Sequence, residues 1–224
     1  MTEREPEGLD LSIQINFHTH VTASVRPGFA VQHLWTARRA AWLCKQREQY
    51  LVDTDYRNID RQHRSHAVTA VLSAFAFVEA HVNDVVDLQQ LAISDRTNPI
   101  DKCQDALTAT GHPRLNTGSG TGQTFDVVRR LRNALVHYKP EWEHGFITGA
   151  LYNDLKNRLK GRENRQRIGE PWFPNKAVGA GCAEWAVDTS VAFALQWHTA
   201  MGLDAAEFDR IYVNWSEPAV DADP

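Results

Sequence analysis

One basic stretch near the middle of the chain carries side chains suited to chemistry on a phosphate group. Arg132 and Asn133 are adjacent there, and His137 follows four residues after the asparagine. Histidine changes charge near neutral pH, so it can act as a general acid or base. Arginine presents a planar fork of donors that matches a phosphate. These residue types together suit the cleavage of a phosphodiester bond.

The asparagine makes this spacing informative. An arginine five residues before a histidine is expected about once by chance in a chain of this composition. Arg61 and His66 form a second such pair, which we attribute to chance. An asparagine directly after the arginine lowers the chance expectation to roughly a few per cent. Only Arg132 meets that condition.

Helical geometry allows the three side chains to serve one site. Asn133 and His137 lie one turn apart on the same face of a helix. Arg132 lies about 140° around the helix from His137 and about 7.5 Å along its axis, so its long side chain can reach a shared groove. The alternative role for His137 is a contact with the last carbonyl groups and the dipole of the helix.

The Arg-Asn-x-x-x-His motif, on an apolar-periodic helix that follows another long helix, resembles the HEPN family of helical-bundle domains. The resemblance implies a mainly α fold, an antiparallel helical bundle. The short β element that we expect at the N-terminus departs from the family pattern. Many members of the family are metal-independent ribonucleases of defence and toxin–antitoxin systems. Their motifs face each other across a twofold axis, which implies a homodimer without a cofactor.

On this resemblance we expect an endoribonuclease that cuts single-stranded RNA to 2′,3′-cyclic phosphate and 5′-hydroxyl ends. His137 would be the general base or acid, Arg132 would hold the phosphate, and Asn133 would orient the histidine or the phosphate. The expected partners are RNA, a second copy of the chain and a cognate antitoxin protein. The alternative is a non-catalytic HEPN-like module that dimerises or binds a partner or a nucleotide.

Residues on two helices could support the motif. Glu79 falls on the apolar face of the preceding helix, where a carboxylate needs a charged or hydrogen-bonding partner. Arg132 and Arg129 are the candidate partners, and Asn83 lies one turn further along. Glu79 would then orient the arginine of the motif. The equally weighted alternative is a half-exposed glutamate at the edge of the apolar stripe.

Basic residues after the motif are the candidate RNA-backbone patch. A solvated basic loop is the more common explanation of such a run. Trp172 and Phe173 follow it and could stack on bases, although the prolines on either side equally indicate a packed loop. The candidate RNA-binding residues are Lys139, Lys156, Arg158, Lys160 and Arg162.

His18 and His20 form a second candidate site. Their His-x-His spacing resembles the metal pair of amidohydrolases, but that fold needs a much longer barrel of alternating strands and helices. A metal hydrolase built on this pair is therefore the weakest alternative, and no metal ligands are assigned.

Composition limits the class of protein. The 224 residues are 42% hydrophobic and 23% charged, which is ordinary for a globular domain. A formal charge of −4 means that any site for a polyanion is a local patch. The three cysteines are far apart in the sequence, which favours a reducing cytoplasm. We expect neither a secretory signal nor a membrane span, because no apolar run is long enough.

Periodicity and breakers divide the chain into elements. Alternating apolar residues over 9–21 predict a strand. On the helix predicted at 31–52, Leu34, Trp35, Trp42 and Leu51 are the expected core contacts. We expect an N-terminal tail and strand at 1–30, one helical domain at 31–202 and an acidic extension at 203–224. Further helices are predicted at 66–92, 101–108, 124–138, 146–160 and 182–201.

Overall fold

The computed structural model describes residues 28–94, 96–137 and 149–213. All regular structure in these ranges is helical, which confirms the expected mainly α class. The strand predicted at 9–21 lies outside the described residues. The helices are α1 (Phe29–Asp53), α2 (Arg61–Leu88), α3 (Pro99–Ala109), α4 (Gly120–Val136), α5 (Ala150–Arg158), α6 (Trp172–Asn175), α7 (Ala180–Ala200), α8 (Ala205–Phe208) and the short π-helix η1 (Asp209–Val213).

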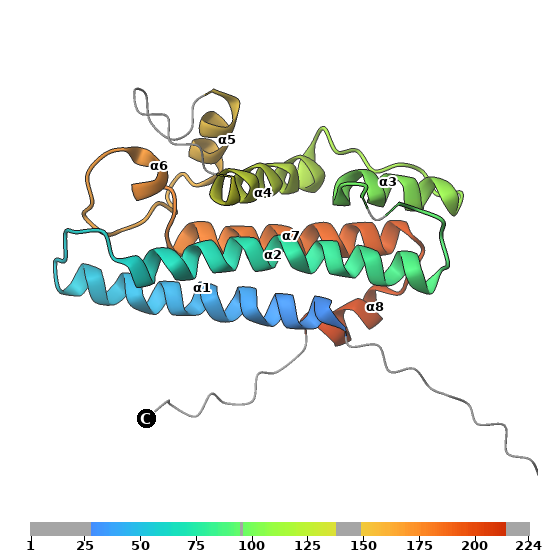
Figure 1. Ribbon diagram of the computed structural model, residues 1–224, viewed down its shortest axis with the longest axis horizontal. Coiled ribbons are helices and arrows are strands. Elements are labelled where there is room, and N and C mark those ends of the chain that lie inside the picture. Colours follow the sequence, from blue (N-terminus) through green and yellow to red (C-terminus); the bar gives the residue numbers. More distant parts are fainter. Residues whose placement is uncertain (1–27, 95, 138–148, 214–224) are drawn as a thin grey trace, which may run out of the picture.

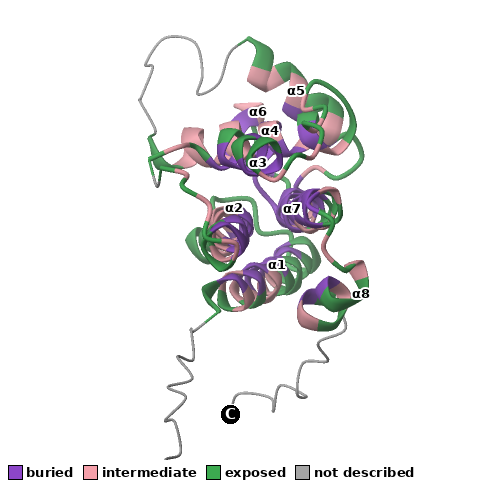
Figure 2. Ribbon diagram, turned by 90° about the vertical axis from the view of Figure 1, so that its right-hand side faces the viewer, coloured by how far each residue is buried: buried purple, intermediate pink, exposed green. Residues whose placement is uncertain are grey.

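Three long helices, α1, α2 and α7, lie side by side along the long axis of the molecule (Figure 1). Viewed from the end, α4 and α3 form a second layer over α2 and α7 (Figure 2). The short helices α5 and α6 lie near one end of this bundle, and α8 lies at the other (Figure 1). The colours of Figure 1 show that α4 runs opposite to α2 and α7, so its motif-bearing end points towards α5 and α6.

Local capping explains where several helices begin. The Asp60 side chain accepts a hydrogen bond from the His63 amide and starts α2 five residues before the start that periodicity predicts. Asn98 caps α3 in the same way, and Pro99 occupies its first position, where no amide donor is needed. These termini satisfy amide groups that a helix leaves unpaired.

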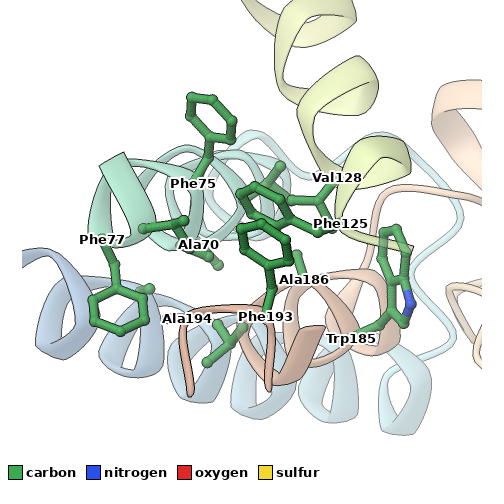
Figure 3. Close-up of a cluster of buried hydrophobic side chains, with 14 of the residues drawn as sticks. Ala70, Phe75, Phe77, Phe125, Val128, Trp185, Ala186, Phe193 and Ala194 are labelled. Atoms are coloured by element: carbon green, nitrogen blue, oxygen red, sulfur yellow. The ribbon is translucent and has the colours of Figure 1, made fainter. Parts of the chain in front are cut away.

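Stacked aromatic rings hold α4 in place over α2 and α7 (Figure 3). Phe125 of α4 is fully buried and stacks on Phe193 of α7 with ring centroids 4.3 Å apart. On its other side it stacks on Phe75 of α2 at 5.8 Å. Aromatic pairs of this kind contribute about 0.5–1.5 kcal/mol beyond the burial of their area. The three rings therefore fix the position of α4 in the groove between α2 and α7.

The orientation of α1 differs in part from the expectation. Leu34 and Leu51 are buried, as predicted, but Trp35 is 37% exposed and Trp42 is 50% exposed. Trp35 and Trp42 are seven residues apart and therefore share one face of α1. That face lies roughly 130° around the helix from the buried stripe. The indole of Trp42 is covered instead by the guanidinium of Arg39, 5.0 Å from the ring centroid. The prediction that both tryptophans contact the core is wrong.

The segment expected as a C-terminal extension begins with two structured turns. Phe208 of α8 is fully buried, and Tyr212 of η1 packs against Phe77 of α2 with centroids 5.2 Å apart. Residues 205–213 therefore complete the core at the end of the bundle opposite α5 and α6.

By length and composition, α2 is the one helix in the described part of the chain that could cross a membrane. Half of its most apolar window is buried inside the fold, between α1, α4 and α7. A core helix of a bundle passes the same test, so this finding is weak evidence for a membrane span.

Candidate functional site

The motif lies at the end of α4 that faces α5. Arg132 and Asn133 belong to the last turns of the helix, and His137 is its C-cap residue. The His137 amide still donates to the Asn133 carbonyl, 2.8 Å away. Helical geometry therefore persists up to the histidine, and the predicted one-turn separation of Asn133 and His137 is present.

Two contacts hold the side chain of Arg132, which is half-buried. Its Nη1 donates to Asn133 Oδ1 at 3.1 Å. Its guanidinium carbon lies 5.3 Å from the centroid of the Phe75 ring, within the range of a cation–π interaction. The structure thus brings Arg132 and Asn133 together, and a ring from the core supports the charged group from below.

The neighbouring arginines on α4 have carboxylate partners. Arg129 pairs with Asp126 at 2.7 Å, and Arg130 pairs with Asp154 of α5 at 2.7 Å. Arg132 makes no ion pair with any described residue. Of these three guanidiniums, it is therefore the one whose charge is not matched within the described ranges.

His137 is exposed. Across residues 28–94, 96–137 and 149–213, its ring forms no hydrogen bond, so it does not cap the last carbonyls of α4 through its side chain. An exposed imidazole is accessible to a bound molecule. The end of α4 therefore offers a guanidinium without an ion-pair partner among the described residues, an amide and an accessible imidazole.

The expected supporting contacts are not formed. Glu79 is half-buried and pairs with neither Arg132 nor Arg129, which has Asp126 as its partner. Asn83 is exposed and accepts a hydrogen bond from Lys102 Nζ of α3 at 2.8 Å. The alternative interpretation of Glu79, a glutamate at the edge of the apolar stripe, fits these contacts.

The basic residues gather around α5 and the start of α4 instead of around Arg132. Arg158 Nη2 donates to Gln123 Oε1 at 3.2 Å, and Gln123 precedes Arg132 by about 14 Å along the helix. Lys156 lies over the ring of Tyr152, and Lys160 and Arg162 are exposed. Lys139 lies outside the described residues.

The aromatic pair after the basic residues forms part of a packed loop. Phe173 is buried, and Trp172 packs against the Tyr152 ring with centroids 5.2 Å apart. The alternative in which these rings are available for base stacking is not supported by this packing.

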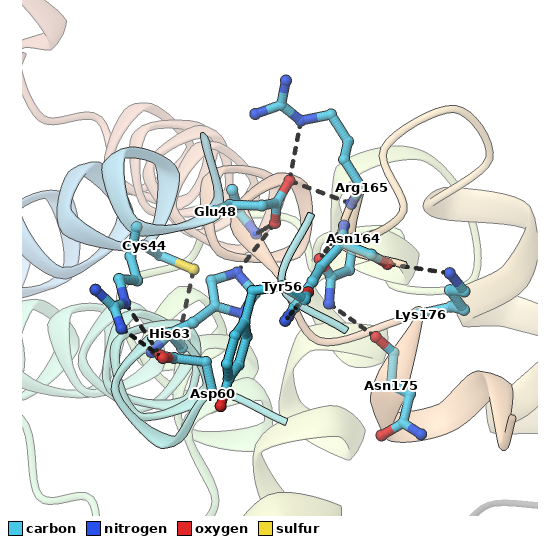
Figure 4. Close-up of polar contacts among 12 residues, drawn as sticks. Cys44, Glu48, Tyr56, Asp60, His63, Asn164, Arg165, Asn175 and Lys176 are labelled. Atoms are coloured by element: carbon cyan, nitrogen blue, oxygen red, sulfur yellow. Dashed lines mark hydrogen bonds and ion pairs between the residues drawn. The ribbon is translucent and has the colours of Figure 1, made fainter. Parts of the chain in front are cut away.

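Sequence reasoning missed a buried polar network at the α5–α6 end of the bundle (Figure 4). Glu48 of α1 lies 3.1 Å from His63 Nε2 and accepts from the Ala180 amide at 2.8 Å and from Arg165 Nε at 3.1 Å. Burial raises the pKa of Glu48, but these hydrogen bonds outweigh it and leave the pKa lowered. No sequence signal marks this network, because its members are brought together by packing.

A second unpredicted cluster closes the opposite end. His198 Nε2 donates to the Asp204 carbonyl at 3.2 Å, so its Nδ1 must accept from His81 Nε2, 3.3 Å away. His81 Nδ1 then accepts from the Tyr212 hydroxyl at 3.1 Å. All three groups line a largely apolar pocket of about 320 Å³. In this arrangement the Nδ1 atoms of His198 and His81 both accept a hydrogen bond, and a ring nitrogen can accept only in a neutral histidine.

Within the described ranges, no group of three or more histidine, cysteine or acidic side chains could hold a metal ion. His18 and His20 lie outside these ranges. Comparison with models of known protein families, with curated proteins and with solved structures gave no match.

Proposed function

We propose that this protein is a metal-independent endoribonuclease of HEPN type that acts as a homodimer on single-stranded RNA. The observation that carries the proposal is the set of contacts made by the Arg132 guanidinium. Its guanidinium is held by Phe75 and Asn133, has no carboxylate partner among the described residues, and lies on the same end of α4 as the exposed His137. A cation with spare donors at the same helix end as an accessible imidazole suits a phosphodiester.

The proposed reaction is an internal transesterification. The imidazole of His137 removes the proton of a 2′-hydroxyl, whose oxygen attacks the adjacent phosphorus. The bond from phosphorus to the 5′-oxygen breaks, and the leaving oxygen takes a proton from a second imidazole. A second copy of α4 across a twofold axis would supply that group. Arg132 stabilises the charge that builds on the phosphate oxygens, and Asn133 keeps the guanidinium in place.

The test is cleavage of unstructured RNA by the purified full-length protein in the presence of a chelator. We expect products with 2′,3′-cyclic phosphate ends, identified by mass spectrometry. His137→Ala should lower kcat by about 10²–10⁴-fold, as for loss of a general acid–base residue. Arg210→Ala, on η1 at the far end of the molecule, is the control for loss of one positive charge and should cleave normally.

Arg132→Lys separates charge from geometry. A lysine keeps the charge but cannot present two parallel donors, so we expect activity between those of wild type and Arg132→Ala. Sedimentation analysis of each variant checks that the dimer persists. Cleavage that is unchanged in His137→Ala, or absent from wild type on several RNA sequences, would refute the ribonuclease assignment.

The half-burial of Arg132 favours one other candidate, a non-catalytic HEPN-like module that dimerises or binds a partner through this end of α4. In that case the wild type would dimerise or bind without cutting RNA, and Arg132→Ala would weaken that association.

A further inference from the structure

The N-terminus of α4 is left without a cap in the described structure. Ser119 is the N-cap residue but makes no side-chain hydrogen bond to the helix, and the first turn contains no acidic residue. The amides of Gly120, Thr121 and Gly122 donate to no described residue. Side chains cap α2, α3 and α8, and the Glu48 carboxylate accepts from the first amide of α7, whereas α1 and α5 share with α4 the lack of a side-chain cap. Free amides at a helix start favour an anion.

Two arginines approach this uncapped turn across an open pocket of about 470 Å³. Arg158 is placed there by its hydrogen bond to Gln123, which belongs to the first turn of α4. Arg162 lines the same pocket and forms no ion pair with any residue in the described ranges. The opposite wall is α7, which contributes Trp185, Asp188 and Thr189.

The side chain of Thr189 in this wall points independently to a ligand. Thr189 is 7% exposed and lines the pocket, yet its hydroxyl forms no hydrogen bond within the described part of the chain. The amides of Gly120 and Thr121, the two guanidiniums and this hydroxyl are all donors on residues that line the pocket, so they fit a compact group with several acceptor oxygens.

Asp188 sets the balance of charge in the pocket, since it is the acidic residue that lines it. Burial raises the pKa of Asp188, whereas the nearby Arg162 lowers it. The two arginines and this one carboxylate together leave the pocket with one net positive charge. The helix terminus adds a partial positive charge. Asp188 should therefore weaken, without preventing, the binding of an anion.

We propose that this pocket, the α4 phosphate site, binds a phosphate group, either of an RNA strand or of a free nucleotide. The free amides of Gly120 and Thr121 and the guanidiniums of Arg158 and Arg162 would bind its oxygens. The Thr189 hydroxyl would donate to one of them. The site lies at the opposite end of α4 from Arg132. Its existence does not depend on whether the motif end of α4 is catalytic.

Isothermal titration of the full-length His137→Ala protein tests the site without interference from RNA cleavage. The probes are inorganic phosphate, adenosine monophosphate and an eight-residue oligouridylate. Binding of the first two identifies a site for a free phosphate or nucleotide. Binding of the oligouridylate alone identifies a site for the RNA backbone. Binding of none of the three overturns the proposal.

Variants then locate the binding. Loss of a charged hydrogen bond should weaken binding of the responding probe about tenfold in Arg158→Ala or Arg162→Ala. Thr189→Val keeps the shape of the side chain and should weaken it about threefold to tenfold. Asp188→Asn should strengthen binding severalfold, a result that unfolding cannot imitate. The control, Arg210→Ala, should leave it unchanged. Equal weakening by the control, or no gain in Asp188→Asn, would place the ligand elsewhere.

Discussion

The guanidinium of Arg132 rests on the ring of Phe75, with 5.3 Å between the guanidinium carbon and the ring centroid. Phe75 comes from α2, and the same ring stacks on Phe125 of α4 at 5.8 Å. One side chain of the core thus both holds α4 in place and supports the charged group of the motif. This coupling suggests that the orientation of Arg132 depends on the core beneath it.

Phe75→Leu should therefore impair RNA cleavage more than its effect on folding explains. Loss of a cation–π contact worth about 1 kcal/mol would lower kcat/KM about fivefold. The matched control is Phe77→Leu, which removes a buried ring from the same helix that packs on His81 and Tyr212. Initial cleavage rates and urea denaturation of both variants provide the comparison. Equal losses of activity in the two would show that Phe75 acts only through stability.

Glu48→Gln should be strongly destabilising. The carboxylate is 2% exposed and bonds His63, the Ala180 amide and Arg165, so its loss leaves these donors poorly paired. Breaking a buried pair of this type costs about 3–5 kcal/mol, read from the urea midpoint. Glu184→Gln breaks the exposed pair with Lys45 and should cost less than about 1 kcal/mol. Similar costs for the two variants would contradict a special role for Glu48.

Stability should fall as the pH drops below about 6.5. Burial, and then the neighbouring His198, lowers the pKa of His81 to about 3, so the unfolded chain binds its proton first. The contribution of neutral His81 is complete above the unfolded pKa of about 6.5 and declines towards the folded value. Between pH 6.5 and 4.5 this amounts to roughly 2–3 kcal/mol of unfolding free energy.

Urea denaturation across that range measures the effect, and His81→Phe should flatten the dependence because the titrating group is gone. Glu48 acts in a lower window: its lowered pKa means that its contribution is present above about pH 4.5 and is lost below it. An identical slope in wild type and His81→Phe between pH 6.5 and 4.5 would exclude His81 as the source.

The three cysteines should resist alkylation in the folded protein. Cys44, Cys103 and Cys182 are free and buried, and burial raises the pKa of each thiol, that of Cys182 to about 12. The thiolate is the reactive form, so iodoacetamide at pH 8 should label none of them natively and all three in urea. Mass spectrometry gives the count. Rapid native labelling of any one would show that its region opens locally.

The sequence by itself determined the longer helices and the motif. Spacings of three and four between apolar residues depend only on neighbours within a turn or two. The caps Asp60 and Asn98 are equally local, but periodicity alone did not identify them and placed the start of α2 five residues late. The separation of Asn133 and His137 follows from the same geometry. The HEPN resemblance and the ribonuclease activity that it implies stay predictions.

Tertiary packing decided which helix faces are exposed and which residues distant in the sequence meet. Which face of α1 turns outward, and thus the exposure of Trp35 and Trp42, depended on how α1 meets α2 and α7. The pairing of Glu48 with the Ala180 amide joins residues 132 positions apart, and the approach of Arg158 to Gln123 joins residues 35 apart. Contacts over such distances arise when helices pack against one another, and periodicity within one helix contains no information about its neighbours.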